Sequence, residues 1–86
     1  MALRILGAAD DVPERIAAAI RAAVSGAEVQ VKPGGAGHFE VRVVAEAFRG
    51  LSMLKQHQMV YGALAPLMAG DTPPVHAIDR LQTQTP

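Results

Sequence analysis

Three histidines, His38, His57 and His76, are the side chains best suited to chemistry in this sequence of 86 residues. Neutral imidazole can bind a metal, and it can accept or donate a proton near neutral pH. The sequence contains no cysteine, so disulfides, thiolate metal sites and a cysteine nucleophile are all excluded. Any metal held here would need histidine, carboxylate or ligands supplied by a partner.

No recognisable catalytic site accompanies these histidines. The sequence has neither a serine, histidine and carboxylate pattern of familiar spacing nor a convincing pair of catalytic carboxylates. The glycine-rich segment KPGGAG (32–37) lacks the Lys-Ser or Lys-Thr ending of a phosphate-binding loop, and a hairpin turn is the simpler interpretation. We therefore predict that the protein is not an enzyme.

Three basic residues, Arg49, Lys55 and Arg80, could contact the phosphates of a nucleic acid. The overall charge balance disfavours this, because eight basic and eight acidic residues are scattered along the chain and aromatic residues for stacking on bases are few. Glu46 further dilutes the basic group near Arg49. The alternative is that all three side chains belong to solvated faces.

The length and the 50% hydrophobic content predict one compact domain over residues 1–86. Residues 1–10 form a candidate disordered leader. Their apolar stretch is interrupted by Arg4 and is too short for a secretory signal, so we expect a cytoplasmic protein.

A first amphipathic helix is predicted after Asp10 and Asp11. Either aspartate can cap its start, Pro13 suits its first turn, and apolar residues recur at every fourth position in 16–24. Two strands follow, because apolar and polar residues alternate over 28–32 and again over 39–44. The short turn at 33–37 between them predicts an antiparallel pair.

A second, longer helix is predicted from a cap at Ser52. Its expected sheet-facing residues lie three or four positions apart and are Met53, His57, Val60, Leu64 and Met68. Pro66 cannot donate a backbone hydrogen bond, so a kink or an early end near Ala65 is expected.

A last strand is predicted over 75–83, with a bulge near Asp79 or Arg80 where the alternation breaks. Because a helix connects it to the preceding strand, the two strands should pair in parallel. The prediction is an α+β fold with a three-stranded mixed sheet and helices packed on one face.

Several segments, taken in order, resemble the BolA family. They are GHFEV (37–41), FRG (48–50), LKQHQMVYGAL (54–64), VHA (75–77) and the closing TP (85–86). The resemblance covers residues 14–86, and the short hairpin loop with MVYG (59–62) is closer to the IbaG-type branch. Two features depart from the family pattern: one additional residue between VHA and TP, and Pro66 in a normally helical stretch.

This resemblance implies an α-β-β-α-α-β order, similar to a class II KH domain and containing a helix-turn-helix-like element. It also implies a non-enzymatic adaptor that partners a monothiol glutaredoxin in binding or transferring a 2Fe-2S cluster, and so acts in iron-sulfur trafficking and iron homeostasis. His76 matches the family's cluster ligand, and His38 matches a second ligand position in the preceding loop. Glutaredoxin and glutathione would supply the thiolates, and imidazole is a competent ligand beside them.

Other readings of the same residues remain open. An isolated histidine such as His76 can be merely structural, His38 can be a water-facing residue at the start of a strand, and His57 fits helix packing or partner contact. A nucleic-acid-binding transcriptional regulator, using the helix-turn-helix-like element with Arg49 and Lys55, is the rival function. A third hypothesis is an interaction module that binds no metal.

Overall fold

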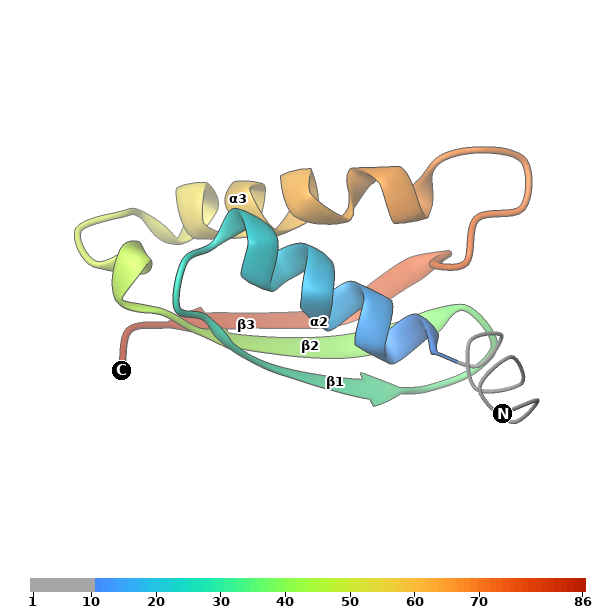
Figure 1. Cartoon of the computed structure of the whole chain (residues 1–86), viewed down its shortest axis with the longest axis horizontal. Coiled ribbons are helices and arrows are strands. Elements are labelled where there is room, and N and C mark those ends of the chain that lie inside the picture. Colours follow the sequence, from blue (N-terminus) through green and yellow to red (C-terminus); the bar gives the residue numbers. More distant parts are fainter. Residues whose placement is uncertain (1–10) are drawn as a thin grey trace.

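The computed structural model describes residues 11–86, so the leader predicted for residues 1–10 lies outside the described part of the chain. Its elements, in chain order, are helix α2 (Val12–Ala23), strand β1 (Glu28–Pro33), strand β2 (His38–Val44), the 3-10 helix η1 (Glu46–Phe48), helix α3 (Met53–Met68) and strand β3 (Ala77–Gln84) (Figure 1). This order confirms the predicted α+β fold, whereas the likeness to a class II KH domain stays a prediction.

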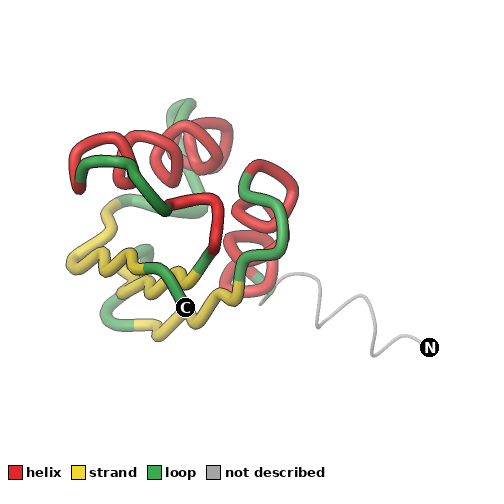
Figure 2. The backbone as a smooth tube through the Cα atoms, turned by 90° about the vertical axis from the view of Figure 1, so that its left-hand side faces the viewer, coloured by secondary structure: helices red, strands yellow, loops and turns green. Residues whose placement is uncertain are grey.

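The three strands form one sheet in the order β1-β2-β3. Strands β1 and β2 are antiparallel and joined by a short turn, and β2 and β3 are parallel and connected through α3. Both helices lie on the same side of this mixed sheet, and no element of residues 11–86 covers its other face, which we call the uncovered face (Figures 1 and 2). The predicted topology is therefore confirmed.

The core lies between the sheet and the two helices, and it follows the two sequence periods. Every second residue of β2 from Phe39 to Val43 is buried, as expected for the covered face of a strand. Ile16 and Ile20 of α2 are fully buried against it, since residues four apart share one face of a helix, and so is Val24, the C-cap residue of α2. From α3, Val60 and Leu64 complete the packing.

The bulge predicted in the last strand is present at Asp79. Phe39 pairs with Ile78 and Glu40 pairs with Arg80, so Asp79 has no partner residue on β2. The additional residue keeps Ile78 and Leu81 packed against the core, as the apolar residues of β3 require. An irregularity of the sequence pattern therefore becomes a local feature of the sheet.

Three local expectations need correction. The early end expected near Ala65 is wrong, because helix α3 continues past Pro66 to Met68. The carbonyl of Gly62, which loses its hydrogen bond, belongs to an exposed residue and can be hydrated. Met53, the first residue of α3, lies on the sheet-facing side as predicted, with its Sδ 3.4 Å from the Thr83 Oγ1, but it stays 57% exposed and is not part of the core. Asp11 occupies the N-cap position of α2 without a side-chain capping hydrogen bond, in a non-extended conformation.

The middle helix implied by the family resemblance is a single 3-10 turn, η1, of three residues. Only a short connection separates the end of β2 from the cap of α3, and the fully buried Phe48 anchors it in the core. Gly50 then turns the chain with a φ of 82°, a backbone conformation that side chains disfavour. Within residues 11–86 the order therefore has two α-helices rather than three.

Candidate functional site

Two of the predicted site residues, His38 and His76, lie at the same end of the sheet. We call this region the histidine end, and it comprises the β1–β2 turn (34–37), His38, His76 and Asp79. His38 opens β2, and its register partner is Ala77, the first residue of β3 and the residue after His76. The parallel pairing of two strands distant in sequence thus brings two histidines together.

Gly37 holds these two segments in contact. Its carbonyl oxygen accepts hydrogen bonds from the backbone N–H groups of His76 and Ala77, at 2.8 and 3.1 Å. Its φ is 74°, and a Cβ at this position would come within 2.7 Å of the His76 Cγ. A glycine is therefore required both by the backbone conformation and by the imidazole that lies against it.

The two imidazoles differ in their surroundings. His76 is exposed, and its imidazole forms no hydrogen bond with another described residue. The Nδ1 atom of His38 lies 2.9 Å from the Asp79 Oδ1, and these side chains are 44% and 49% exposed. Both rings are thus accessible, and one of them is held by a carboxylate.

The histidine end does not contain a complete metal site of its own. Within residues 11–86 no group of three or more histidine, aspartate or glutamate side chains is arranged to hold a metal ion. Two imidazoles fit the donor chemistry of a shared iron-sulfur cluster, in which other ligands are thiolates. The side chains present are therefore suited to complete a coordination sphere begun by another molecule.

His57 lies away from the histidine end, near the start of α3, and it is partly buried. Its Nε2 atom is buried and finds no hydrogen-bond partner in the described part of the chain. Together with Met53 it borders a shallow hollow over the last residues of β3. The structure thus places His57 between helix and sheet and does not bring it to the other two histidines.

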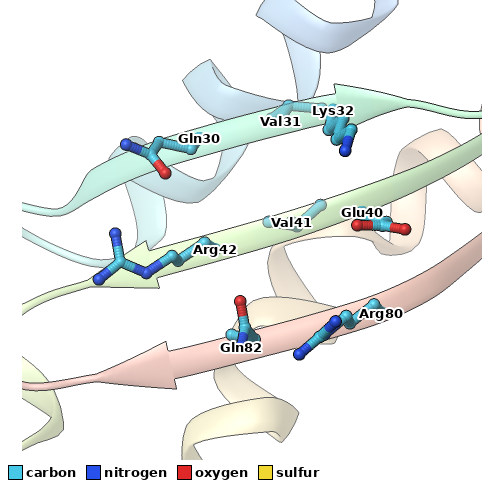
Figure 3. Close-up of a pocket in the computed structure, with 8 residues that line it drawn as sticks. All are labelled: Gln30, Val31, Lys32, Glu40, Val41, Arg42, Arg80 and Gln82. Carbon is cyan, nitrogen blue, oxygen red and sulfur yellow. The ribbon is translucent and has the colours of Figure 1, made fainter.

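Arg80 lies on the uncovered face of the sheet, where polar side chains stand in two rows across the strands (Figure 3). Lys32, Glu40 and Arg80 form one row, and Gln30, Arg42 and Gln82 form the other. They surround an open hollow of about 190 Å³. These six side chains include three cations and one carboxylate.

Arg49 and Lys55 lie at the opposite end of the sheet from the histidines, after β2 has ended. Arg49 forms a two-pronged ion pair with Glu46, one of whose contacts is 3.0 Å long. This hydrogen bonding lowers the pKa of the Glu46 carboxyl below its ordinary value of 4.5 and raises the pKa of Arg49. The positive charge of Arg49 is therefore partly neutralised by Glu46. Arg49 also lies apart from Arg80, which is on the uncovered face of the sheet.

The helix-turn-helix-like element implied by the family resemblance is shortened in the segment that contains Arg49. Its first member would be η1, a three-residue 3-10 turn, whereas such a motif needs two helices that cross at a defined angle. The geometry therefore gives the nucleic-acid hypothesis less support than the family resemblance implied. Neither helix of the described residues has the length and apolar character needed to cross a membrane.

The model of the BolA-like protein family matches residues 19–86. The chain belongs to the BolA-like family. BolA-like protein 1 of Homo sapiens is 46% identical over 56 residues, which are 65% of this chain and 38% of that protein. The bovine BolA-like protein 1 has the same identity and coverage. This BolA-like chain thus spans well under two thirds of the length of these curated relatives.

Solved structures agree with the assignment. A BolA protein homologue from Coxiella burnetii is 35% identical, with a TM-score of 0.67, over 83% of this chain and 86% of that chain. The solution structure of BolA1 from Mus musculus is 34% identical, with a TM-score of 0.67, over 87% of this chain and 65% of that chain. The BolA-like fold is therefore shared by proteins of distant organisms.

Two residues of the histidine end in this BolA-like protein were missed as site residues at the sequence level. Gly37 was assigned only to a turn, and Asp79 only to a bulge. The sequence did hold a signal for Asp79, because the broken alternation in the last strand lies beside a histidine. The signal for Gly37 was its position directly before His38, but its contact with His76 depends on strand pairing.

Proposed function

We propose that this protein is a non-enzymatic adaptor that partners a monothiol glutaredoxin in binding or transferring a 2Fe-2S cluster. The observation that carries the proposal is that two accessible histidines, His38 and His76, lie at the same end of the sheet, one on either side of the contact made by Gly37. We further propose that the chain belongs to the IbaG-type branch, on the basis of its short β1–β2 turn and MVYG segment, and that it acts in the cytoplasm.

The chemistry of the donor set supports this role. A chain without cysteine has no thiolate to offer, so it would depend on the glutaredoxin cysteine and the glutathione thiol for sulfur ligands. Its own contribution would be neutral imidazole, which is an established alternative to thiolate on one iron of a 2Fe-2S cluster. Alone, the protein should hold a cluster poorly, and the cluster is its cargo rather than a resident cofactor.

The proposal is tested by titrating cluster-loaded glutaredoxin with this protein and recording visible circular dichroism under anaerobic conditions. The native protein should change the spectrum, because replacing a thiolate by imidazole alters the iron environment. His76→Ala should abolish the change and His38→Ala should weaken it. His57→Ala is the matched control and should retain the change, since His57 lies elsewhere. An unchanged spectrum with the native protein would refute the proposal.

A further inference from the structure

Asp79 interrupts the pairing of β2 and β3, and its side chain is used at the histidine end. It is the bulge residue, without a partner on β2, while its neighbours Ile78 and Arg80 are both paired. Its Oδ1 lies 2.9 Å from the Nδ1 of His38, a residue 41 positions earlier in the chain. The bulge thus delivers a carboxylate to an imidazole that begins the adjacent strand.

This contact decides which nitrogen of His38 is free. A carboxylate oxygen can only accept a hydrogen bond, so Nδ1 must carry the proton when it faces Asp79. In neutral imidazole the other nitrogen, Nε2, then holds an unshared electron pair. A histidine whose second nitrogen donates to a carboxylate has its tautomer and ring direction fixed, as in many metal-binding histidines.

The rest of the turn leaves His38 no comparable support. Its backbone is held by two turn hydrogen bonds, from the Gly34 N–H to the His38 carbonyl and from the His38 N–H to the Gly35 carbonyl. Its side chain has no hydrogen bond to any other described residue besides the one with Asp79. With 44% of the side chain exposed, the ring would otherwise sample several rotamers in water.

We propose that Asp79 is a positioning residue that holds His38 in its Nδ1–H tautomer and presents Nε2 as the donor atom for iron. This inference rests on the proposed function, because iron is taken to arrive with a partner. The unpaired bulge residue thereby gains a role, because its carboxylate reaches the imidazole of His38.

The first measurement concerns the free protein. Long-range proton–nitrogen correlation spectra at about pH 8, where an ordinary imidazole is neutral, report the tautomer of each histidine. We expect the Nδ1–H form for His38 in the native protein and a mixture dominated by the other form in Asp79→Ala. Asp79→Asn retains an oxygen that can accept the hydrogen bond and should keep the Nδ1–H form. An Nε2–H tautomer in the native protein, or no change in Asp79→Ala, would overturn the proposal.

The second measurement concerns the complex with cluster-loaded glutaredoxin. Asp79→Ala should weaken the interaction by about 10- to 100-fold, the usual effect of removing a carboxylate behind a metal-bound histidine. Glu28→Ala removes the same charge from the other end of the sheet, where Glu28 pairs with Val44, and should bind like the native protein. Equal binding of Asp79→Ala and native protein would overturn the proposed role of Asp79.

The two measurements separate this inference from the proposed function. If the native protein forms no complex with cluster-loaded glutaredoxin, the adaptor function fails, and the role of Asp79 toward iron fails with it. The tautomer of His38 and its dependence on Asp79 would still be established by the spectra of the free protein. If the native complex forms but is insensitive to Asp79→Ala, only the positioning role fails.

Discussion

The two ends of the sheet are built in different ways. At the histidine end, a glycine turn, the hydrogen bond between His38 and Asp79 and a few backbone hydrogen bonds hold exposed imidazoles. The opposite end, which we call the capped end, comprises η1, Arg49, Ser52, Gln56 and Thr83. There Phe48 is fully buried, the Ser52 side chain accepts a hydrogen bond from the Lys55 N–H, and Thr83 donates to the Gln56 side chain at 2.7 Å.

This difference indicates a division between stability and binding. Buried apolar area and helix caps stabilise the fold at the capped end. The histidine end places polar, accessible groups where a partner could reach them, and it contributes little apolar burial. Substitutions at the capped end should therefore act on unfolding, whereas substitutions of the exposed side chains at the histidine end, His38, His76 and Asp79, should act mainly on binding.

The largest effect is expected from Phe48→Ala. Removing this fully buried ring should lower the free energy of unfolding by about 3–5 kcal/mol, because apolar contacts are lost and a cavity remains. Urea denaturation followed by far-ultraviolet circular dichroism measures the change. Leu54→Ala, at a residue 67% exposed, is the control and should cost under about 0.5 kcal/mol. Similar costs for both would show that η1 does not anchor the capped end.

A smaller effect on stability, with a clear effect on His76, is expected from Gly37→Ala. The positive φ and the close approach to the His76 ring should together cost about 1–3 kcal/mol. The methyl group should also displace the imidazole and shift its nuclear magnetic resonance signals. Gly26→Ala shares a positive φ of 72° but has no neighbour within 4 Å, so it isolates the backbone strain. Equal costs and unmoved His76 signals would contradict the predicted contact.

Ser52→Ala should cost about 1 kcal/mol, because the first turn of α3 loses its side-chain cap. The unfolding midpoint in urea measures this loss. Cluster-dependent binding of glutaredoxin should be unchanged, since Ser52 belongs to the capped end. Ser25→Ala, in the exposed turn after α2, is the control with little expected change. If Ser52→Ala weakened the binding of cluster-loaded glutaredoxin while the protein remained folded, the proposed division between the two ends would be wrong.

The smallest effect concerns the exposed pair of Glu46 and Arg49. Because the hydrogen bond from Arg49 lowers the pKa of Glu46 in the folded state, the pair stabilises the fold above the ordinary carboxyl value of 4.5. That stabilisation is lost as the pH falls through the lowered pKa. Arg49→Gln should raise the pKa of Glu46 in a nuclear magnetic resonance titration. High salt should weaken the effect, and an unchanged pKa in Arg49→Gln would argue against the pair.

Much of the fold could be predicted because periodic patterns survive without tertiary information. The stripe of α2, the alternation in β2 and the mixed sheet topology followed from spacing and connection rules alone. The early helix end at Pro66 was wrongly predicted because spacing does not report what covers a residue: Gly62 is exposed, so α3 continues to Met68. Spacing placed Met53 on the sheet-facing side but could not show that it stays largely exposed there. The family resemblance implied a third helix. In the structure this segment is only a 3-10 turn, whose residue Phe48 is packed in the core.

Less of the candidate site could be predicted from the sequence. The resemblance singled out His38 and His76, and the residues themselves explained why imidazole is the ligand this chain could offer. The sequence analysis grouped Arg49, Lys55 and Arg80 by their charge. In the fold, Arg80 lies on the uncovered face of the sheet, and the other two lie beyond the end of β2. Spacing along the chain carried no information about that separation.

The sequence by itself determined the types of element, their order, the apolar faces that form the core, and the supply of imidazole without thiolate. Only the tertiary structure decided that Gly37 lies against His76 and that Asp79 meets His38. The physical reason is that local periodicity fixes which face of an element is buried, whereas the register between strands distant in sequence fixes which side chains become neighbours.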